Sequence, residues 1–132
     1  MSDPALIASG LLSRAATLSV GSPALPISYP DVAFTPPADG KYLEVSIFYN
    51  RPAWEGLAAG RMDQGLLQVT VVGPKGQGIP ALMRLASDVI DHFPKGLSLT
   101  GGVKISRQPY AASPLLDDAD TRVPVTIGWT AR

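Results

Sequence analysis

The fold is decided by residues 34–93, which contain two strand-like segments, YLEVSIFY (Tyr42–Tyr49) and LLQVTVV (Leu66–Val72), followed by a helix-like segment. Both strand-like segments are rich in β-branched and aromatic residues, which favour extended backbone. Apolar side chains alternate along each segment, so that one face is strongly apolar and the other is mixed. This alternation predicts an antiparallel sheet covered by helices on one side. Its predicted core-facing residues are Leu43, Val45, Ile47, Tyr49, Leu67, Val69 and Val71.

Between the two strands lie residues 50–65, in which apolar side chains follow no period. We predict a long loop here, from about residue 50 to 65. Most connections in a compact domain span about 4–6 residues, and longer ones are often functional. Exposed tryptophan and arginine are typical interface anchors. The candidate protein-interaction residues of this loop are therefore Arg51, Trp54, Glu55 and Arg61. The sequence leaves open whether Trp54 points outward or folds back to cap the sheet.

A glycine-rich turn, Gly73–Gly78, connects the second strand to a helix predicted from about Ile79 to His92. Pro80 is acceptable in its first turn, and Pro94 ends it. The apolar residues of this helix recur at i, i+3, i+4 and i+7, which is typical of a core-facing stripe. They are Leu82, Leu85, Ala86, Val89 and Phe93.

Outside this stretch, the pattern of residues 4–18 predicts a short amphipathic helix, and Ser2 or Asp3 can cap it. Gly10 weakens this helix by roughly 1 kcal/mol relative to alanine. Prolines keep residues 20–37 extended, and the apolar residues among them predict that this segment lies against the body.

Residues 103–108 and 122–130 predict the third and fourth strands. Because Pro124 lacks an N–H group, we expect the fourth strand to lie at an edge or to contain a bulge. The predicted class is α+β: a mostly antiparallel four-stranded sheet packed by two helices, with the long loop between the first two strands.

The composition fits one domain spanning residues 1–132. With 45% hydrophobic and 17% charged residues, the chain is not of a disordered type. Eleven basic and eleven acidic residues balance, which argues against nucleic-acid binding by phosphate neutralisation. There is no cysteine, no apolar run of the roughly 20 residues that a membrane helix needs, and no positively charged leader. We therefore expect no membrane association and a cytoplasmic location where the chain is made.

Three groups resemble catalytic or binding motifs, and each has a simpler structural explanation. His92, with Asp88 and Asp91 nearby, suggests a general base, but a basic group in a last helical turn also complements the helix dipole. The acidic cluster at 117–120 suggests a cation site, but it lacks the pattern of a calcium loop and fits a solvated turn better. The Gly73–Gly78 turn lacks the residue order of a phosphate-binding loop. We expect no enzymatic activity, no cofactor and no metal site.

Three segments are similar to one family: PDVAFTPPADGKYLEVSIFYNRP (Pro30–Pro52), RMDQGLLQVTVVGPKGQGIPALMRLASDVIDHF (Arg61–Phe93) and VPVTIGW (Val123–Trp129). They resemble the tail terminator-like proteins of long-tailed bacteriophages and prophages, in the lambda-type branch of minor tail proteins. The resemblance covers nearly the whole chain from about Pro30. Its specific part is the combination of F-T-P-P-A-D-G-x-Y-L-x-V, G-L-L-Q-V-x-V and a G-x-G turn before a helix.

The resemblance implies a small α+β subunit that assembles as a hexameric ring, caps the tail tube, ends tube polymerisation and presents a surface to the head connector. Its partners would be itself, the tail tube protein and the head–tail connector protein, without sequence-specific nucleic-acid binding. It would reside in the virion tail, and in the host cytoplasm during assembly. Two alternatives stay open: a head–tail connector or completion protein, and a small nucleotide- or ligand-binding module that uses the Gly73–Gly78 turn.

Overall fold

The computed structural model describes the backbone of residues 3–21, 24–54 and 61–131, and the side chains of these residues except 52–54 and 61. This part of the chain contains two α-helices, one short 3-10 helix (η1) and seven strands, which confirms the α+β class. In chain order they are α1 (Pro4–Ala15), β1 (Ile27–Ser28), β2 (Tyr42–Trp54), β3 (Arg61–Pro74), α2 (Pro80–His92), η1 (Thr100–Gly102), β4 (Val103–Ile105), β5 (Tyr110–Ala111), β6 (Leu115–Leu116) and β7 (Asp120–Ala131).

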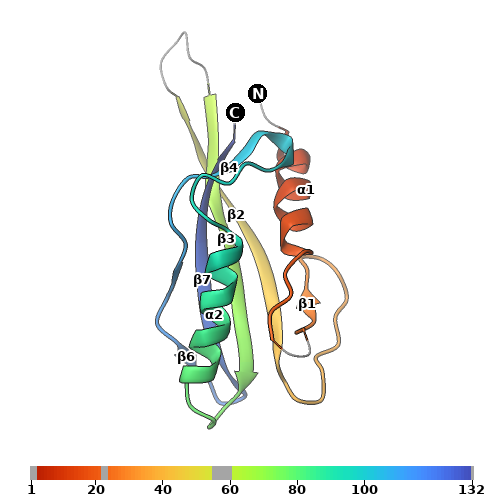
Figure 1. The fold of residues 1–132 in the computed structure, drawn as a ribbon. Coiled ribbons are helices and arrows are strands. Elements are labelled where there is room, and N and C mark those ends of the chain that lie inside the picture. Colours follow the sequence, from red (N-terminus) through yellow and green to blue (C-terminus); the bar gives the residue numbers. More distant parts are fainter. Residues whose placement is uncertain (1–2, 22–23, 55–60, 132) are drawn as a thin grey trace.

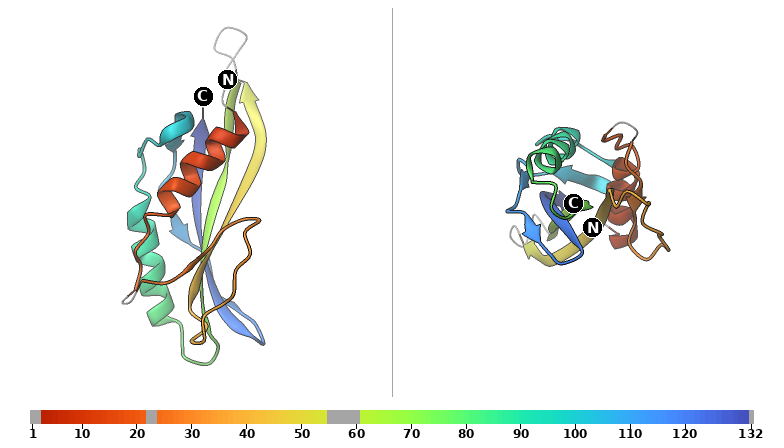
Figure 2. Two further views of the ribbon diagram at one scale, coloured as in Figure 1. Left: turned by 90° about the vertical axis from the view of Figure 1, so that its right-hand side faces the viewer. Right: turned by 90° about the horizontal axis from the view of Figure 1, so that it is seen from below.

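The strands form one mixed sheet in the order β1-β2-β3-β7-β4, and β5 and β6 also pair with β7. The three long strands β2, β3 and β7 are antiparallel neighbours, whereas β1 runs parallel to β2. Both helices lie on the same face of the sheet, as the alternation predicted (Figure 1, Figure 2). The prediction of four strands was too few, because β1, β5 and β6 have two residues each and such short strands show no alternation. The predicted third strand, 103–108, ends at Ile105.

The core lies between the two helices and the sheet. Asp3 caps α1 by accepting a hydrogen bond from the Ala5 backbone N–H at 2.8 Å. The helix ends at Ala15 rather than at residue 18, because the Leu18 N–H turns back to the Ala15 carbonyl. Buried core residues include Ile7, Leu11, Ala15 and Leu18 from the N-terminal segment, Leu43, Val45, Leu67, Val69 and Val71 from the sheet, and Leu82, Ala86, Val89 and Phe93 from the second helical segment.

The prediction of a long loop over residues 50–65 was wrong. β2 continues to Trp54 and β3 begins at Arg61, and the two strands pair in this region with a register shift between Asn50 and Ala53. Such a shift is a bulge, and a bulge accommodates Pro52, which has no N–H to donate to a ladder. Figure 1 shows these ends of β2 and β3 extending beyond α1 and η1. The described part of the segment is therefore a projecting pair of strands.

The expectation that the last strand lies at an edge or contains a bulge was also wrong, since its pairing with β3 runs from Asp120 to Ala131 without a register shift. β7 pairs with β3 on one side and with β4, β5 and β6 on the other. The Pro124 carbonyl accepts a hydrogen bond from the Ala112 N–H, so the carbonyl and the nitrogen of Pro124 both face away from β3. On that side, residues 112–114 separate β5 from β6. The missing donor falls in a gap of the ladder.

Candidate functional site

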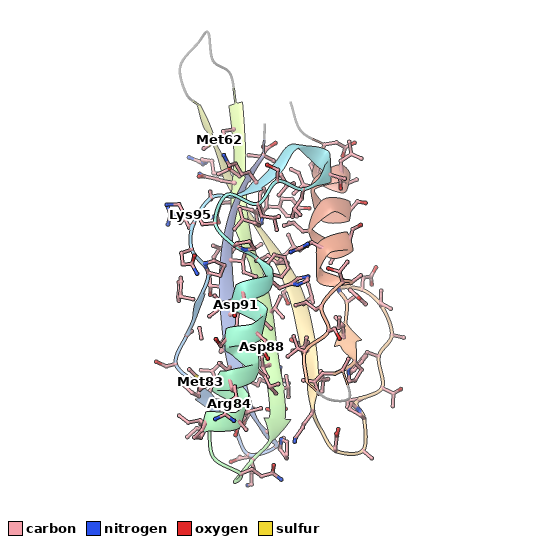
Figure 3. The ribbon with its side chains drawn as sticks, in the orientation of Figure 1. Met62, Met83, Arg84, Asp88, Asp91 and Lys95 are labelled. Carbon is pink, nitrogen blue, oxygen red and sulfur yellow. The ribbon has the colours of Figure 1, made fainter. Side chains whose placement is uncertain are left out.

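The strongest sequence candidate, the projecting end of β2 and β3, is only partly described. Arg51 is exposed, and its backbone carbonyl accepts a hydrogen bond from the Gln64 side chain at 2.9 Å. Trp54 and Arg61 are direct cross-strand partners, so the fold brings two of the four candidates together. Their side chains and the whole of Glu55 lie outside the described part of the structure, and the direction of Trp54 stays untested. Figure 3 shows Met62 near this end.

The sheet face opposite the helices forms a second candidate surface, which the sequence analysis did not identify. Phe48 and Leu66 are direct cross-strand partners on it, and 49% and 37% of their surfaces are exposed. Tyr110 pairs with Thr126, which is two residues from Gly128, the partner of Leu66 on β7, so Tyr110 lies on the same face. It is 59% exposed. The available signal was the position of Phe48 on the otherwise mixed face of its strand. An uncharged aromatic and aliphatic patch of this kind is typical of the centre of a protein interface.

At the other end of this sheet face, charged side chains replace the apolar ones. Arg122 contacts Glu44 at 3.3 Å and Asp120 at 3.1 Å. The hydrogen bond from Arg122 to Asp120 is the largest influence raising the pKa of the guanidinium, and the pair with Glu44 also raises it. This three-residue network therefore spans from β7 to β2 across β3, on the partly exposed surface of the sheet.

The acidic cluster is a solvated turn, as the structural explanation predicted. The Asp117 N–H donates to the Asp120 carbonyl at 3.0 Å, which closes the β6–β7 connection. The Asp117 carboxylate accepts from the Asp118 N–H, and Asp120 pairs with Arg122. Among the described residues, no group of three or more His, Cys, Asp or Glu side chains is placed to hold a metal ion.

The Gly73–Gly78 turn adopts the tight connection that its glycines allow. Gly76 and Gly78 have φ angles of 83° and 79°, a region that side chains disfavour. The following helix has Ile79 at its N-cap, without a side-chain cap hydrogen bond. Glycine at 76 and 78 is therefore explained by the path of the backbone.

His92 links the two helices. The Arg14 guanidinium of α1 donates to the His92 carbonyl from Nε at 3.1 Å and from Nη2 at 2.8 Å. The His92 ring lies 2.6 Å from Thr17 Oγ1 and 3.2 Å from the Arg14 carbonyl through its Nε2. The charged Arg14 side chain of α1 therefore lies at the C-terminus of α2 and complements the dipole of α2. The sequence analysis had assigned this role to His92.

The pH dependence of stability should report this contact. Burial is the main cause that lowers the pKa of His92 and the Arg14 charge adds to it, against a smaller opposing effect of the hydrogen bond to the Arg14 carbonyl. Since the unfolded chain then binds more protons, stability is complete above the ordinary histidine pKa of about 6.5 and falls as the pH drops through the folded value. Urea unfolding between pH 8 and pH 5 should show this loss in the natural chain and not in His92→Gln. A stability difference between the two that does not change with pH would contradict it.

The geometry defines an α+β protein whose notable features are surfaces: a projecting strand pair, an open sheet face and exposed edge residues. A sequence profile of phage tail terminator proteins matches residues 6–129. The chain therefore belongs to the phage tail terminator protein family, which confirms the resemblance. This membership supports a structural role in the phage tail, as a component of the virion tail.

A comparison with solved structures agrees with the fold. A solved structure superposes with a TM-score of 0.78 at 29% sequence identity, and the alignment covers 98% of this chain and 96% of that chain. No curated protein matches the chain. None of the described helices has both the length and the apolar character that crossing a membrane requires.

Proposed function

We propose that this protein forms a ring on the end of the tail tube, stops the addition of tube subunits and provides the surface to which the head connector binds. The observation that carries the proposal is the family match over residues 6–129. The ring is proposed to be a hexamer of this chain, and the other partners are the tube protein and the connector protein.

The distribution of surfaces supports this function. A closed ring needs heterologous contacts, in which one patch of a subunit meets a different patch of the next. The chain offers several distinct patches, since Phe48 and Leu66 lie on the sheet face, Leu116 lies on an edge strand, and Arg51 lies on the projecting strand pair. The balanced charge is suited to contacts between proteins rather than to phosphate neutralisation.

Electron microscopy of growing tail tubes tests the proposal. Purified protein added to tubes in the presence of free tube protein should produce a density at one tube end and stop elongation. Tubes that keep elongating at saturating protein would overturn the function. A head–tail connector or completion protein would behave differently, because it would bind tails that are already terminated and leave bare tubes free to grow.

A further inference from the structure

One end of the molecule carries an exposed apolar protrusion. Leu115 and Leu116 form β6, and 57% and 77% of their surfaces are exposed. Asp117 and Asp118 follow directly, and neither forms an ion pair with a described residue. We name residues 115–118 the LLDD hairpin. The two side chains point to opposite faces of β6, and covering Leu116, the more exposed of the two, would remove a large apolar side chain from water.

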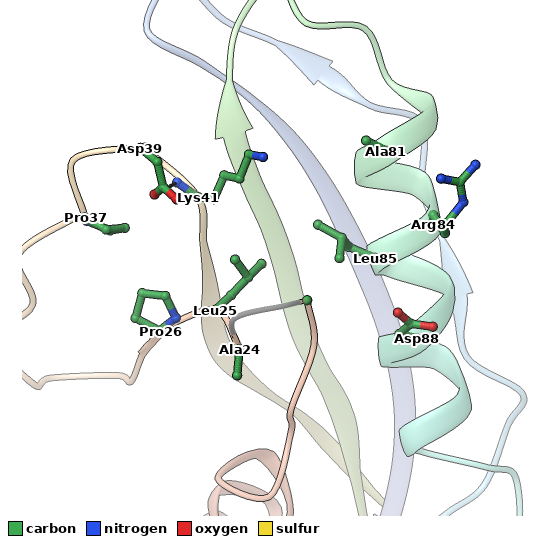
Figure 4. A pocket seen from close by; sticks show the side chains of 11 residues that line it. Ala24, Leu25, Pro26, Pro37, Asp39, Lys41, Ala81, Arg84, Leu85 and Asp88 are labelled. Carbon is green, nitrogen blue, oxygen red and sulfur yellow. Dashed lines mark hydrogen bonds between the residues drawn. The ribbon is translucent and has the colours of Figure 1, made fainter.

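A pocket of about 500 Å³ lies at the same end, between α2 on one side and Gly21 with residues 24–41 on the other. Figure 4 shows its two walls, with Leu25 and Pro26 on one side and Ala81 and Leu85 on α2. Leu25 and Leu85 are partly buried and pack against the core. The pocket is therefore an apolar recess open to solvent.

Four charged side chains surround this recess: Lys41, Arg84, Asp39 and Asp88. In Figure 4, Lys41 reaches toward α2, and the Arg84 side chain extends from the flank of that helix that faces away from Lys41. Figure 3 places Arg84 in the N-terminal half of α2 and Asp88 just past its middle. No ion pair joins any of the four to another described residue. Two unpaired cations are thus available to acidic groups of a partner, while the two carboxylates restrict where those groups can lie.

We propose that the LLDD hairpin of one subunit binds in this pocket of the next subunit in the ring. Leu116 contacts the apolar walls, and Asp117 and Asp118 remain at the mouth, next to Lys41 and Arg84. Asp39 lies beside Lys41, and Asp88 lies one turn from Arg84 on α2, so the acidic residues of the hairpin must approach the cations from the side away from these two carboxylates, which restricts its orientation. This inference rests on the proposed ring function and names the contact that builds the ring.

The placement of the two patches fits ring closure. Figure 1 shows β6 and the segment around β1 on opposite sides of the lower, N-terminal half of α2. The patches differ from each other, as a heterologous contact requires, and they lie at one end of the molecule. If the ring axis runs parallel to the strands, rotating one copy about it brings its hairpin to the pocket of the next copy without any shift along the axis, so the ring can close. A small ligand in the pocket would leave Leu116 exposed, whereas a second copy covers the hairpin and fills the recess at once.

Disulfide cross-linking tests the contact in a chain that has no cysteine of its own. Leu116→Cys and Ala81→Cys proteins, mixed on tail tubes and oxidised, should give a cross-linked dimer that neither protein gives alone. Ser87→Cys is the matched control, because residue 87 is exposed on α2 and does not line the pocket. Rings on the tubes without cross-linking above this control would overturn the contact and leave the ring intact. Natural tubes without any ring would overturn both.

A charge exchange gives an independent readout. Asp118→Lys should raise the concentration needed for ring formation at least tenfold, because it places a cation beside Lys41 and Arg84. Combining Asp118→Lys with Asp117→Asn, Lys41→Glu and Arg84→Glu should restore assembly, because no carboxylate of the hairpin then faces the new glutamates. None of the four natural side chains forms an ion pair within the described part of the subunit, so unchanged thermal unfolding should confirm that each variant folds. Failure of the quadruple variant to recover, with the fold intact, would count against the proposed pairing.

Discussion

Gly10→Ala is expected to destabilise the protein by about 1–3 kcal/mol, the usual cost of overpacking a core, although alanine is the best helix former. Helix propensity alone predicts a gain of roughly 1 kcal/mol for this change. In the structure Gly10 is buried in α1, and a Cβ atom there would overlap the backbone carbonyl oxygen of Thr100 and lie 3.3 Å from its Oγ1. A carbonyl in the backbone of η1 cannot rotate away as the end of a long side chain can, so α1 must move.

A second close contact makes this movement costly. A Cβ at Gly101 would lie 2.5 Å from the Leu6 carbonyl oxygen, and Gly101 also has a φ of 80°. Glycines on both sides therefore let α1 and η1 approach backbone to backbone, and α1 cannot shift without loosening Ile7 and Leu11 in the core.

Urea unfolding measures the effect as a lower midpoint at an unchanged slope. Ser9→Ala is the matched control, since residue 9 is exposed on the same helix and should gain a few tenths of a kcal/mol from propensity. Gly10→Val should lose more than Gly10→Ala because its side chain is larger. A Gly10→Ala protein more stable than the natural chain would show that α1 and η1 are not packed as closely as described.

The elements that the sequence predicted correctly are those whose burial is periodic. The stripe of α2 and the alternation in β2 and β3 appear in the sequence because a helix or a strand with one buried face repeats its apolar residues. Tyr49 departs from its row: it is 49% exposed, its hydroxyl donates to the Pro4 carbonyl, and its ring packs edge-on against Trp129. The position of α1 decides this, and local alternation contains no information about α1.

The elements that were missed depend on partners far away in the sequence. Gly65 looked like part of a loop, but it pairs with Trp129, and a Cβ at this position would lie 2.6 Å from that ring. Glycine is needed here so that a large side chain can lie against the strand. The same applies to Pro124, which is compatible with an interior strand only because the neighbouring ladder is interrupted there.

The candidate site was predictable only in part, for a related reason. A segment can be suspected of contacting partners when it combines arginine and tryptophan, as residues 51–61 do. Whether an apolar residue is exposed, however, depends on which elements cover it. Leu116 lies in no predicted strand, and the mixed face on which Phe48 lies does not show whether another element covers it; both are exposed in the fold.

Replacing residues 53–61 by Asn-Gly is expected to leave the fold intact and to abolish capping of the tail tube. The replacement keeps the pairing of Asn50 with Gln64, and Asn-Gly favours the tight turn that a two-residue hairpin connection needs. The described core residues all lie outside the removed segment, so the free energy of unfolding should change little. The projecting strand ends, which we propose to contact the tube, would be lost.

Tail length in infected or induced cells measures the effect. With the shortened protein, tubes should grow beyond their normal length and lack heads, while the purified variant keeps the thermal unfolding midpoint of the natural chain. The length-preserving control is Trp54→Ala combined with Arg61→Ala. If this control loses capping as well, the two side chains anchor the contact. If it retains capping, the reach of the strand pair matters more than these anchors. Infectious particles with normal tails from the shortened protein would refute a role for the projection, because a surface that is absent cannot hold the tube end.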